Sequence, residues 1–531
     1  MPKIKIAVFS GPQSTVANSP TLVTSNKARL QGERKLEGRY DPLVAQSLYE
    51  PVKVKIKKYS AHPLEEDAKG VYHDDGKPYY EVELKPEDGL YPLPYVARRK
   101  DGSANGVPFE DGDLNNPSIG FGGRQFFYPD ASRLFEEIDR TIHGRDEHGE
   151  AGILDRKATF DFIRAVPPSG YTSKGEKLGV DYFPYKPPAL ARTPPPSMLA
   201  RAASIVNATL KKGEYDGAIW LEGSPTIEET LFWLGLLTPF ATPFVGVAAQ
   251  RAHGQISNDG DRNIIDAVNY VASGEGKGLG AVGIVDEQIF AAREFKKTDD
   301  RPGGYKATGG HGGILGSMGP PVTIWYKPNY RHTATSMVNM ESLPAVLSFP
   351  DFVGDAHQVT VKIRNEDSSL SGDAIPSVSI AKYGHYSGRD LKGSADSEVE
   401  ILASINNALE RQAQGAVSGV NQLHGLVFEG LAPYGIGAGS QLAALDIAAC
   451  SGLPVVRVGR GEPAGRVPKN QMGLTMDGNN LDATKARILL MAAMMKLGRL
   501  PRAKDPRNAT KQERDAIRVK VQQYQEIFDA H

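Results

Sequence analysis

Two hydroxyl side chains, Ser224 and Thr226, stand where a strand pattern gives way to a helix pattern. Residues 217–221 form the apolar run of a buried strand, a Gly-Ser turn follows, and helix-forming residues begin after Thr226. In open α/β sheets ligands bind at the carboxyl ends of parallel strands, where the first backbone N–H groups of a helix point at the ligand. A hydroxyl at that edge can accept and donate protons, and the N–H groups can stabilise an oxyanion.

A second hydroxyl-rich loop follows the first predicted strand. Residues 4–9 have the alternating pattern of a strand, and the loop from 10 to 20 consists mainly of small and hydroxyl residues, including Ser14 and Thr15. Loops of this kind often carry catalytic groups on a rigid scaffold. Taken alone, Thr15 is better explained as a turn or helix-capping hydroxyl.

The elements that position these loops follow from an alternation of helix and strand patterns. The predicted elements are a helix at 198–210, a strand at 215–221, a helix at 226–234, a strand at 244–248, a helix at 263–272 and a strand at 280–285. This order predicts an α/β fold with a parallel sheet covered by helices on both faces. A shorter alternation near the end of the chain predicts a second, smaller α/β domain, with a strand at 425–430, a helix at 441–451, a strand at 453–458 and an apolar run at 483–495.

The overall charge of the chain narrows the class of partner. The sequence has 531 residues, which is long enough for two domains, and it carries 62 Lys and Arg against 63 Asp and Glu. Such a balance produces no overall field that would attract nucleic acid or an anionic membrane. A small-molecule partner is therefore expected.

The single cysteine and the apolar segments indicate the compartment. Cys450 lies in an apolar helical run, where buried packing is its expected role, and one cysteine excludes an internal disulfide. The N-terminal charges are not followed by the apolar segment of a secretion signal. The apolar stretch 231–249 contains two prolines and two glycines, so we do not expect a membrane span. A cytoplasmic protein is expected.

Several separated motifs resemble the bacterial type L-asparaginase and glutaminase family. Glu-Gly-Ser-Pro-Thr-Ile-Glu-Glu-Thr at 222–230 is similar to the family's His-Gly-Thr-Asp-Thr-x-Glu-Glu-Thr, and Arg-Glu-Phe-Lys-Lys-Thr at 293–298 is similar to its Arg-Asp-Val-Thr-Lys-Thr. Four further segments match in the family's order, at 257–263, 331–333, 455–467 and 480–488. The resemblance implies a larger N-terminal parallel-sheet domain and a smaller C-terminal α/β domain.

The resemblance also suggests where the domains begin and end. We expect an N-terminal domain at 1–325, a connector at 326–345 and a C-terminal domain at 346–531. Two stretches lack family motifs and are expected to be insertions, at about 35–195 and about 351–420. The first is rich in turn signals and in aromatic residues, which favours an ordered segment.

The resemblance implies a nucleophilic threonine in the first loop. Aligning Thr15-Val-Ala with the family's Thr-Ile-Ala assigns that role to Thr15. The two glycines that precede the family's threonine are replaced here by Gln13 and Ser14, so backbone freedom is lower and Ser14 is a rival nucleophile. Either hydroxyl needs a base from elsewhere in the fold.

The family's second active group combines a threonine, an aspartate and a lysine, which correspond here to Ser224, Pro225 and Lys297. Serine keeps a hydroxyl, whereas Pro225 removes both a carboxylate and a backbone N–H. In the family that aspartate also holds the substrate's α-ammonium group. An ammonium without a counter-charge in a desolvated pocket is costly, so free asparagine and glutamine are not the expected substrates.

The replacement of that aspartate by Pro225 also affects the expected protonation state of Lys297. Without that counter-charge its neutral form is favoured, which makes Lys297 a candidate base near neutral pH. Glu222 replaces a histidine of the family motif and lies on the same strand face as Ser224, from where its carboxylate could turn toward Lys297. The plainer alternative is that Glu222 supports the site indirectly or faces solvent.

Other polar residues near these motifs have structural explanations. Ser257, Asp259 and Asn263 are expected to cap the following helix. His253 and His311 lie in glycine-rich loops without metal-ligand spacing. No metal or organic cofactor is expected.

The sequence therefore predicts an amidohydrolase that acts through an acyl-enzyme on Thr15, with Ser224 and Lys297 as activating groups. Backbone N–H groups at the turn 223–226, which begins at Gly223, would hold the oxyanion. The resemblance implies a homodimer or homotetramer. A non-catalytic binding or scaffold protein that has kept the fold is the alternative.

Overall fold

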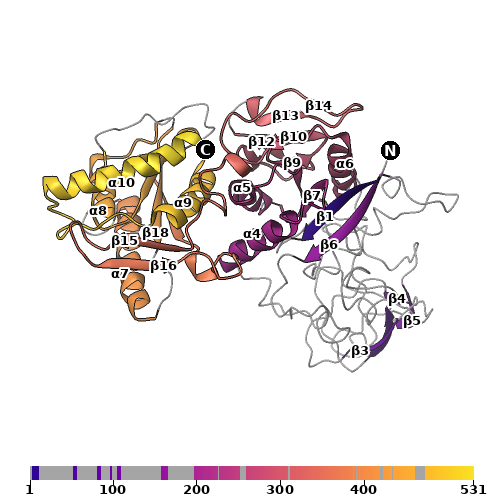
Figure 1. Cartoon of the computed structure of the whole chain (residues 1–531), viewed down its shortest axis with the longest axis horizontal. Helices are drawn as coiled ribbons and strands as arrows, with labels where there is room; N and C mark the ends of the chain where they lie inside the picture. The colour runs from indigo at the N-terminus through magenta and orange to yellow at the C-terminus, as the bar shows by residue number, and fades with distance from the viewer. Residues whose placement is uncertain are drawn as a thin grey trace.

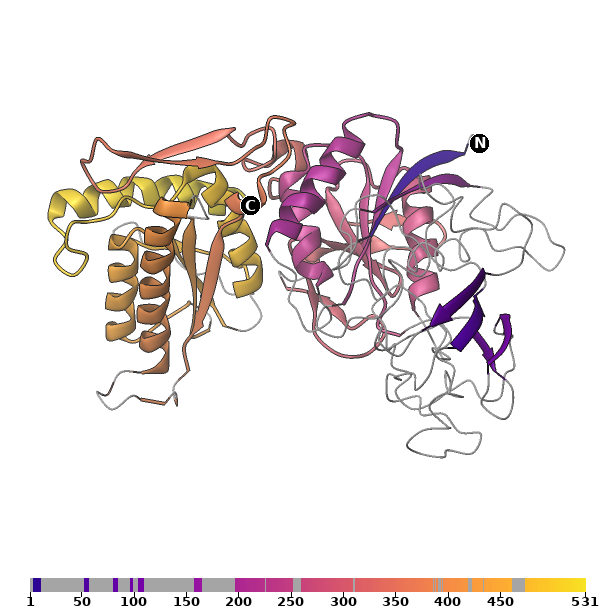
Figure 2. The same cartoon turned by 90° about the horizontal axis from the view of Figure 1, so that it is seen from below.

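The structure, a computed structural model, has two lobes, each built on a β-sheet (Figures 1 and 2). It describes residues 3–10, 52–56, 80–84, 96–98, 104–108, 157–164, 196–224, 226–251, 259–308, 311–384, 386, 388–389, 393, 395–418, 423–432, 434–460 and 473–531. We call the lobe around the first strand the N-terminal lobe and the lobe that contains residues 346–531 the C-terminal lobe. Within the described residues, no helix is both long and apolar enough to cross a membrane.

The N-terminal lobe is built on an eight-stranded sheet in the order β14-β13-β10-β9-β8-β7-β1-β6. Its strands are β1 (Ile4–Ser10), β6 (Ala158–Arg164), β7 (Gly217–Leu221), β8 (Phe244–Val247), β9 (Ala281–Val285), β10 (Gln288–Ala291), β13 (Ile314–Ser317) and β14 (Thr323–Ile324). Five neighbouring strands, β9, β8, β7, β1 and β6, pair in parallel. The other three, β10, β13 and β14, add antiparallel pairs. The predicted parallel sheet is confirmed for its core and extended by an antiparallel edge.

Helices cover both faces of this sheet, as the alternation predicts. They are α4 (Ser197–Leu210), α5 (Ile227–Leu237) and α6 (Gly260–Ser273). Phe9 and Trp220 point into a core that includes residues of α4 and α5. Val8 and Ile219, each one residue earlier, belong to a second core with residues of α6. Strand alternation therefore separates the side chains of β1 and β7 between two buried layers.

The C-terminal lobe has a four-stranded parallel sheet in the order β17-β18-β19-β20. The strands are β17 (Ser377–Lys382), β18 (His424–Gly430), β19 (Val455–Gly459) and β20 (Met476–Asp477). The helices are α7 (Asp396–Ser418), α8 (Gly439–Cys450), α9 (Ala483–Leu497) and α10 (Lys511–Ala530). Cys450 is fully buried, as its apolar surroundings predict.

Smaller elements complete the described chain. In the described part of the chain, two-stranded antiparallel pairs join β2 (Val52–Ile56) with β3 (Tyr80–Leu84), β4 (Val96–Arg98) with β5 (Ala104–Pro108), β11 (Phe295–Lys297) with β12 (Tyr305–Ala307), and β15 (Val346–Pro350) with β16 (Gln358–Lys362). Single turns of 3₁₀ helix lie at η4 (His311–Gly313), η5 (Thr333–Thr335) and η6 (Gly372–Ala374).

Parts of both expected insertions contribute to the sheets. β6 lies within 35–195, yet it pairs along its whole length with β1. β17 and α7 lie within 351–420, and β17 pairs with β18 while α7 packs against α8. Family motifs mark the site and not the scaffold, so their absence from these stretches does not indicate an absence of core elements.

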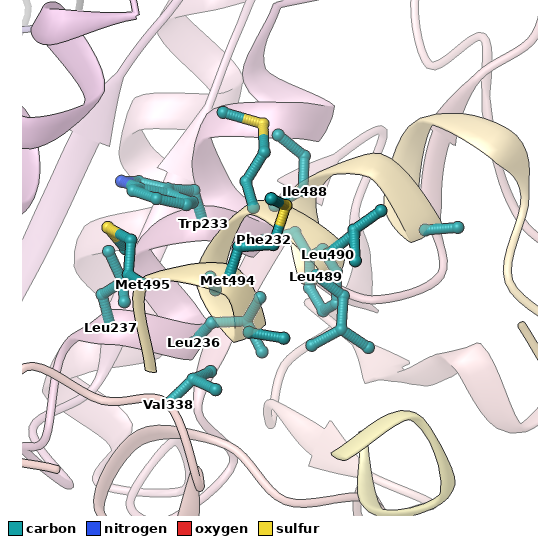
Figure 3. Packing of buried hydrophobic residues seen from close by; sticks show 14 of the residues in the cluster. Phe232, Trp233, Leu236, Leu237, Val338, Ile488, Leu489, Leu490, Met494 and Met495 are labelled. Carbon is teal, nitrogen blue, oxygen red and sulfur yellow. The ribbon is translucent and has the colours of Figure 1, made fainter. Parts of the chain in front are cut away.

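The two lobes share one hydrophobic core. α5 of the N-terminal lobe packs against α9 of the C-terminal lobe, with Phe232 and Leu236 facing Leu489 and Met494 (Figure 3). All four side chains are buried. The segments that carry the strongest sequence motifs, at the start of α5 and the start of α9, are thereby held side by side.

Candidate active site

The carboxyl end of β7 carries a buried carboxylate followed by a hydroxyl. Glu222 is 0% exposed and accepts hydrogen bonds from Trp220 Nε1 at 3.3 Å and from the backbone N–H of Gly223 at 3.0 Å. These bonds fix the carboxylate at the end of its own strand. They also occupy the Gly223 N–H, which is one of the predicted oxyanion donors.

The hydroxyl of Ser224 accepts a hydrogen bond from a tyrosine. Tyr305 Oη, on β12, donates to Ser224 Oγ at 2.8 Å. The tyrosine is only 7% exposed, and its ring stacks on Phe295 with centroids 4.2 Å apart and planes 6° apart. Burial raises the pKa of the Tyr305 phenol well above its ordinary value, which keeps the group protonated and able to donate.

Lys297 lies at the end of β11, against the same tyrosine. Its Nζ is 4.8 Å from the centroid of the Tyr305 ring and donates to the carbonyl oxygen of Arg301 at 3.3 Å. Its backbone N–H donates to Glu228 Oε2 at 2.7 Å, which ties the strand to the first turn of α5. Ser224 and Lys297, which the sequence places 73 residues apart, thus both contact one aromatic side chain.

The pKa of Lys297 lies below its ordinary value. Partial burial lowers this pKa, and the nearby carboxylates of Asp259, Asp299 and Asp300 oppose the shift without cancelling it. The expected direction is therefore found, but the cause is burial and not a lack of acidic neighbours, because three carboxylates lie near Lys297. Glu222, the expected substitute, is not among the carboxylates that act on this amine.

The predicted helix-capping role of Asp259 and Asn263 is wrong. Asp259 precedes α6 but makes no capping hydrogen bond; its carboxylate accepts the backbone N–H groups of Gln250 at 3.0 Å and Arg251 at 2.9 Å. Asn263 Nδ2 donates to the carbonyl of Ala248 at 2.8 Å. Both side chains hold the loop after β8, because backbone groups at a strand end also need partners.

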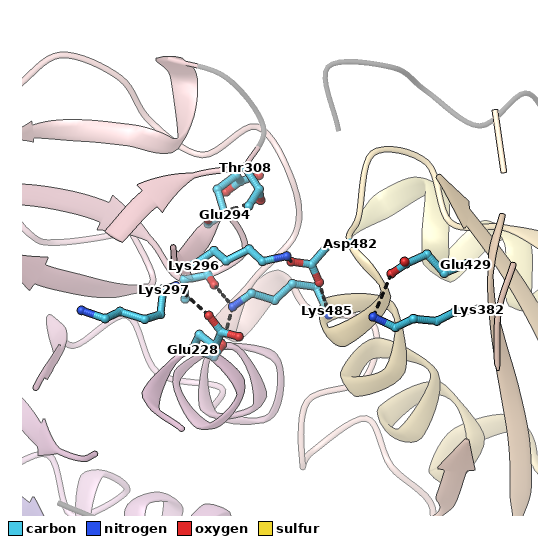
Figure 4. A network of polar contacts seen from close by, with 10 residues as sticks. Glu228, Glu294, Lys296, Lys297, Thr308, Lys382, Glu429, Asp482 and Lys485 are labelled. Carbon is cyan, nitrogen blue, oxygen red and sulfur yellow. Dashed lines mark hydrogen bonds and ion pairs between the residues drawn. The ribbon is translucent and has the colours of Figure 1, made fainter. Parts of the chain in front are cut away.

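Side chains from the start of α9 brace the strand that carries Lys297 (Figure 4). Lys296 Nζ lies 2.9 Å from Asp482 Oδ2. Lys485 Nζ donates to the carbonyl oxygens of Ala292, at 2.8 Å, and of Glu228. The C-terminal lobe therefore contacts both the strand of Lys297 and the helix turn whose Glu228 holds that strand.

The remaining expected site residues fall outside the described part of the chain. These are Thr15, Ser14 and Pro225. His253, Ser257 and the side chain of His311 also lie outside it, so the capping role expected for Ser257 is not tested. The structure therefore brings together Ser224, Gly223, Glu222 and Lys297 from the predicted set, and tests no contact with the first loop. Among the described residues, no group of three His, Cys, Asp or Glu side chains is arranged to hold a metal ion.

Tyr305 was missed by the sequence analysis, although a signal for it exists. Residues 299–304, Asp-Asp-Arg-Pro-Gly-Gly, are typical of a turn between two strands. The resulting hairpin pairs Lys297 directly with Tyr305 across β11 and β12. A hairpin predicted from this turn places Tyr305 beside Lys297.

Comparisons with known proteins point to one family. Residues 193–302 match the family model described as asparaginase, N-terminal. The glutaminase-asparaginase of Acinetobacter glutaminasificans is 31% identical over 146 residues, which make up 27% of this chain and 44% of that protein. L-asparaginase 2 of Bacillus subtilis (strain 168) is 26% identical over 304 residues, 56% of this chain and 66% of that protein.

A solved structure is similar at low identity. The crystal structure of a probable cytoplasmic L-asparaginase from Campylobacter jejuni gives a TM-score of 0.47 at 20% sequence identity, covering 71% of this chain and 93% of that one. In sequence, the chain matches less than half of the Acinetobacter relative and just under two thirds of the Bacillus relative.

Proposed function

We propose that this chain, a divergent asparaginase-family member, hydrolyses a carbon–nitrogen amide bond in a small molecule. The observation that carries the proposal is the convergence of Ser224 and Lys297 on Tyr305, at the carboxyl edge of the parallel sheet. By resemblance to the family motifs, both residues correspond to the family's active lysine group, and both lie within residues 193–302, which match the family model.

The proposed reaction runs through an acyl-enzyme on Thr15. The Thr15 oxygen bonds to the amide carbon, the carbon–nitrogen bond breaks, and the nitrogen takes up a proton; it leaves as ammonia or an amine from a linear amide and remains attached to the acyl group as the free end of the opened ring in a cyclic one. Water then attacks the acyl carbon and releases a carboxylic acid and free Thr15. Neutral Lys297, with Ser224 as its hydroxyl partner, accepts the proton from the attacking group, and backbone N–H groups of the turn 223–226 stabilise the oxyanion.

The proposed substrate is a linear or cyclic amide that lacks an α-ammonium group. The relatives named above include a glutaminase-asparaginase and an L-asparaginase, whereas this chain has Pro225 where the family has an aspartate. The Glu222 carboxylate is held by Trp220 and Gly223 at the end of its strand, which supports a role in shaping the pocket. An amino-acid amide would bring a positive charge to a site that offers it one carboxylate fewer.

The assembly and compartment are part of the proposal. We expect a homodimer or homotetramer, without nucleic acid or membrane partners, in the cytoplasm. The balanced charge supports the absence of a nucleic-acid partner, the single cysteine supports the cytoplasm, and the oligomer is proposed from the family resemblance alone. Light scattering coupled to size-exclusion chromatography would give the mass of the particle, and a monomer at micromolar concentration would contradict it.

The activity is tested with a panel of amides, lactams and imides that also contains asparagine and glutamine. Formation of the product, as ammonia or amine from linear amides and as the ring-opened carboxylic acid from lactams and imides, is measured for the wild type, Thr15→Ala, Ser14→Ala and, as a control, Ser348→Ala, whose hydroxyl lies on the distant β15–β16 hairpin. We expect Thr15→Ala to lower kcat by more than about a thousandfold and Ser348→Ala to leave it unchanged.

The outcomes separate the alternatives. Loss of turnover in Ser14→Ala with activity kept in Thr15→Ala would reassign the nucleophile to Ser14. Turnover of asparagine or glutamine faster than of any other amide would refute the substrate class. If the wild type hydrolyses no compound of the panel, a binding or scaffold protein is favoured.

A further inference from the structure

We propose that Tyr305 is a positioning residue of this site, whose hydroxyl orients Ser224 and whose ring face holds the Lys297 amine. This inference rests on the proposed function and adds to it a residue that neither the sequence motifs nor the comparisons indicate. Two contacts of the Tyr305 side chain support the inference: its hydroxyl contacts Ser224, and its ring contacts Lys297.

The hydroxyl contact sets the direction of the Ser224 hydrogen. Tyr305 Oη donates to Ser224 Oγ at 2.8 Å. A phenol whose pKa is raised by burial remains a donor at every pH at which the protein would be assayed. Because a hydroxyl has a single hydrogen, Ser224 must direct its own toward another acceptor. One rotamer of the serine is thereby favoured before substrate arrives.

The ring contact sets the position of the lysine. Nζ of Lys297 lies 4.8 Å from the ring centroid, within the range of a cation–π contact. The two residues are direct cross-strand partners, so their backbones are fixed relative to each other. Phe295 stacks on the tyrosine ring and is itself 5.5 Å from Phe290, which leaves the ring little freedom to turn.

An uncharged side chain in this place explains how the site functions without the family aspartate. A carboxylate would orient the lysine but would also stabilise its protonated form. The Tyr305 ring face also attracts the protonated amine, but more weakly than a full negative charge does, so it orients Lys297 with a smaller rise in its pKa. Partial burial then keeps the pKa of Lys297 below its ordinary value even with Asp259 nearby. Orientation and deprotonation of the base are therefore both possible in one site.

The hydroxyl is tested by Tyr305→Phe, which keeps the ring. With the amide that the wild type hydrolyses best, we expect kcat to fall about tenfold while KM changes less than twofold, because substrate binding does not require the phenol. Tyr305→Phe combined with Ser224→Ala is the decisive comparison. If Tyr305 acts through Ser224, removing its hydroxyl changes the kcat of the Ser224→Ala variant less than twofold.

The ring is tested by Tyr305→Leu. We expect a further loss of kcat and a shift of the acidic limb of the kcat profile to higher pH, since the water that Lys297 gains stabilises its protonated form more than the lost ring face did. Tyr305→Phe should leave that limb in place. Tyr326→Phe is the matched control, because it removes the same hydroxyl from a tyrosine that is 50% exposed on the N-terminal lobe.

Each failure has a distinct cause. A wild type that hydrolyses an amide, together with a Tyr305→Phe variant of equal kcat, would overturn the role of Tyr305 and leave the proposed function intact. Equal loss from Tyr305→Phe in the wild type and in the Ser224→Ala background would also overturn it, because the effect would then be independent of Ser224. A wild type without activity on any amide would overturn the proposed function and this inference with it.

Discussion

Lys297 shows how burial and charge compete at a single residue. Three carboxylates favour its protonated form, yet partial removal from water lowers its pKa below the ordinary value. The aromatic ring beside it and the carbonyl of Arg301 hold the amine in one place. A base needs both properties, since an amine that is deprotonated but mobile cannot accept a proton at the required moment.

The protonation state of Lys297 leads to a prediction about pH. Because the neutral amine is the proposed base, kcat/KM should rise with pH as Lys297 loses its proton, with a midpoint below the ordinary lysine value of 10.5. Lys297→Arg should lower kcat/KM more than about a hundredfold and remove that rise, because a guanidinium stays protonated. A pH–rate profile of both proteins checks this. An Arg variant with the wild-type limb would show that another group titrates.

At the residue scale, the sequence predicts that Ser224 and Lys297 belong to one site, but it does not predict that Tyr305 contacts both. Ser224 and Lys297 could be assigned from motif positions, and both contact the same tyrosine in the structure. Tyr305 lies in a segment without a family motif, and its role depends on the register of a short hairpin. The bonds of Asp259 could not be predicted, since the same spacing that suits a helix cap also suits a strand-end loop.

At the scale of elements, the start of α9 links the C-terminal lobe to the site. Asp482 is the N-cap of this helix, where Oδ1 accepts the backbone N–H of Lys485 at 2.8 Å, while Oδ2 pairs with Lys296. Burial alone would raise the pKa of this carboxyl, but Lys296 and Lys485 outweigh burial and lower it. One carboxylate therefore supports both a helix end and an ion pair between lobes.

Two substitutions of Asp482 separate these roles. Asp482→Ala removes the cap and the ion pair, and we expect it to lower the free energy of unfolding by about 2 kcal/mol. Asp482→Asn keeps a capping oxygen, so we expect about half that loss. Urea unfolding at neutral pH measures both values. Equal destabilisation by the two variants would mean that the cap contributes nothing measurable.

Two of the elements that were missed are β6, whose local signal is weaker than its tertiary role, and α10, whose local signal is strong. β6 follows a turn-rich stretch, so its seven residues do not stand out, yet β1 supplies a partner along its whole length. α10 has an apolar stripe of Ile517, Val521, Tyr524 and Phe528 and a capping box at Thr510 and Glu513. That helix was predictable from its sequence, whereas β6 depended on a neighbour more than 150 residues away.

At the scale of the whole molecule, α10 reaches back to the segment that joins the lobes. His531 is 1% exposed; its Nδ1 bonds the Ile527 carbonyl at 2.8 Å, and its Nε2 accepts the backbone N–H of Met337 at 3.1 Å. Burial lowers the pKa of this imidazole to about 4, and the positive charges of Arg331, Arg293 and Lys496 act in the same direction. Protonation of Nε2 would break the bond to Met337.

The buried imidazole predicts a loss of stability in mild acid. Its unfolded pKa is near 6.5 and its folded pKa is about 4, so the unfolded state takes up the proton first as pH falls. The free energy of unfolding should therefore decrease between pH 6.5 and 4, by up to about 3 kcal/mol from this group. His531→Gln should flatten the dependence in that window relative to the wild type, as measured by urea unfolding at several pH values. Parallel curves would contradict the assignment.

The buried amine of Lys485 has a thermodynamic consequence for the molecule. This side chain, 1% exposed, spans from α9 to carbonyl groups of two separate segments of the N-terminal lobe, within the core that α5 and α9 share. Neither lobe can lose its structure without exposing the apolar surface of the other. Heating should therefore unfold the two lobes in a single cooperative transition. A substitution that destabilises either lobe, even far from the site, should lower the fraction of folded protein and with it the fraction of active protein.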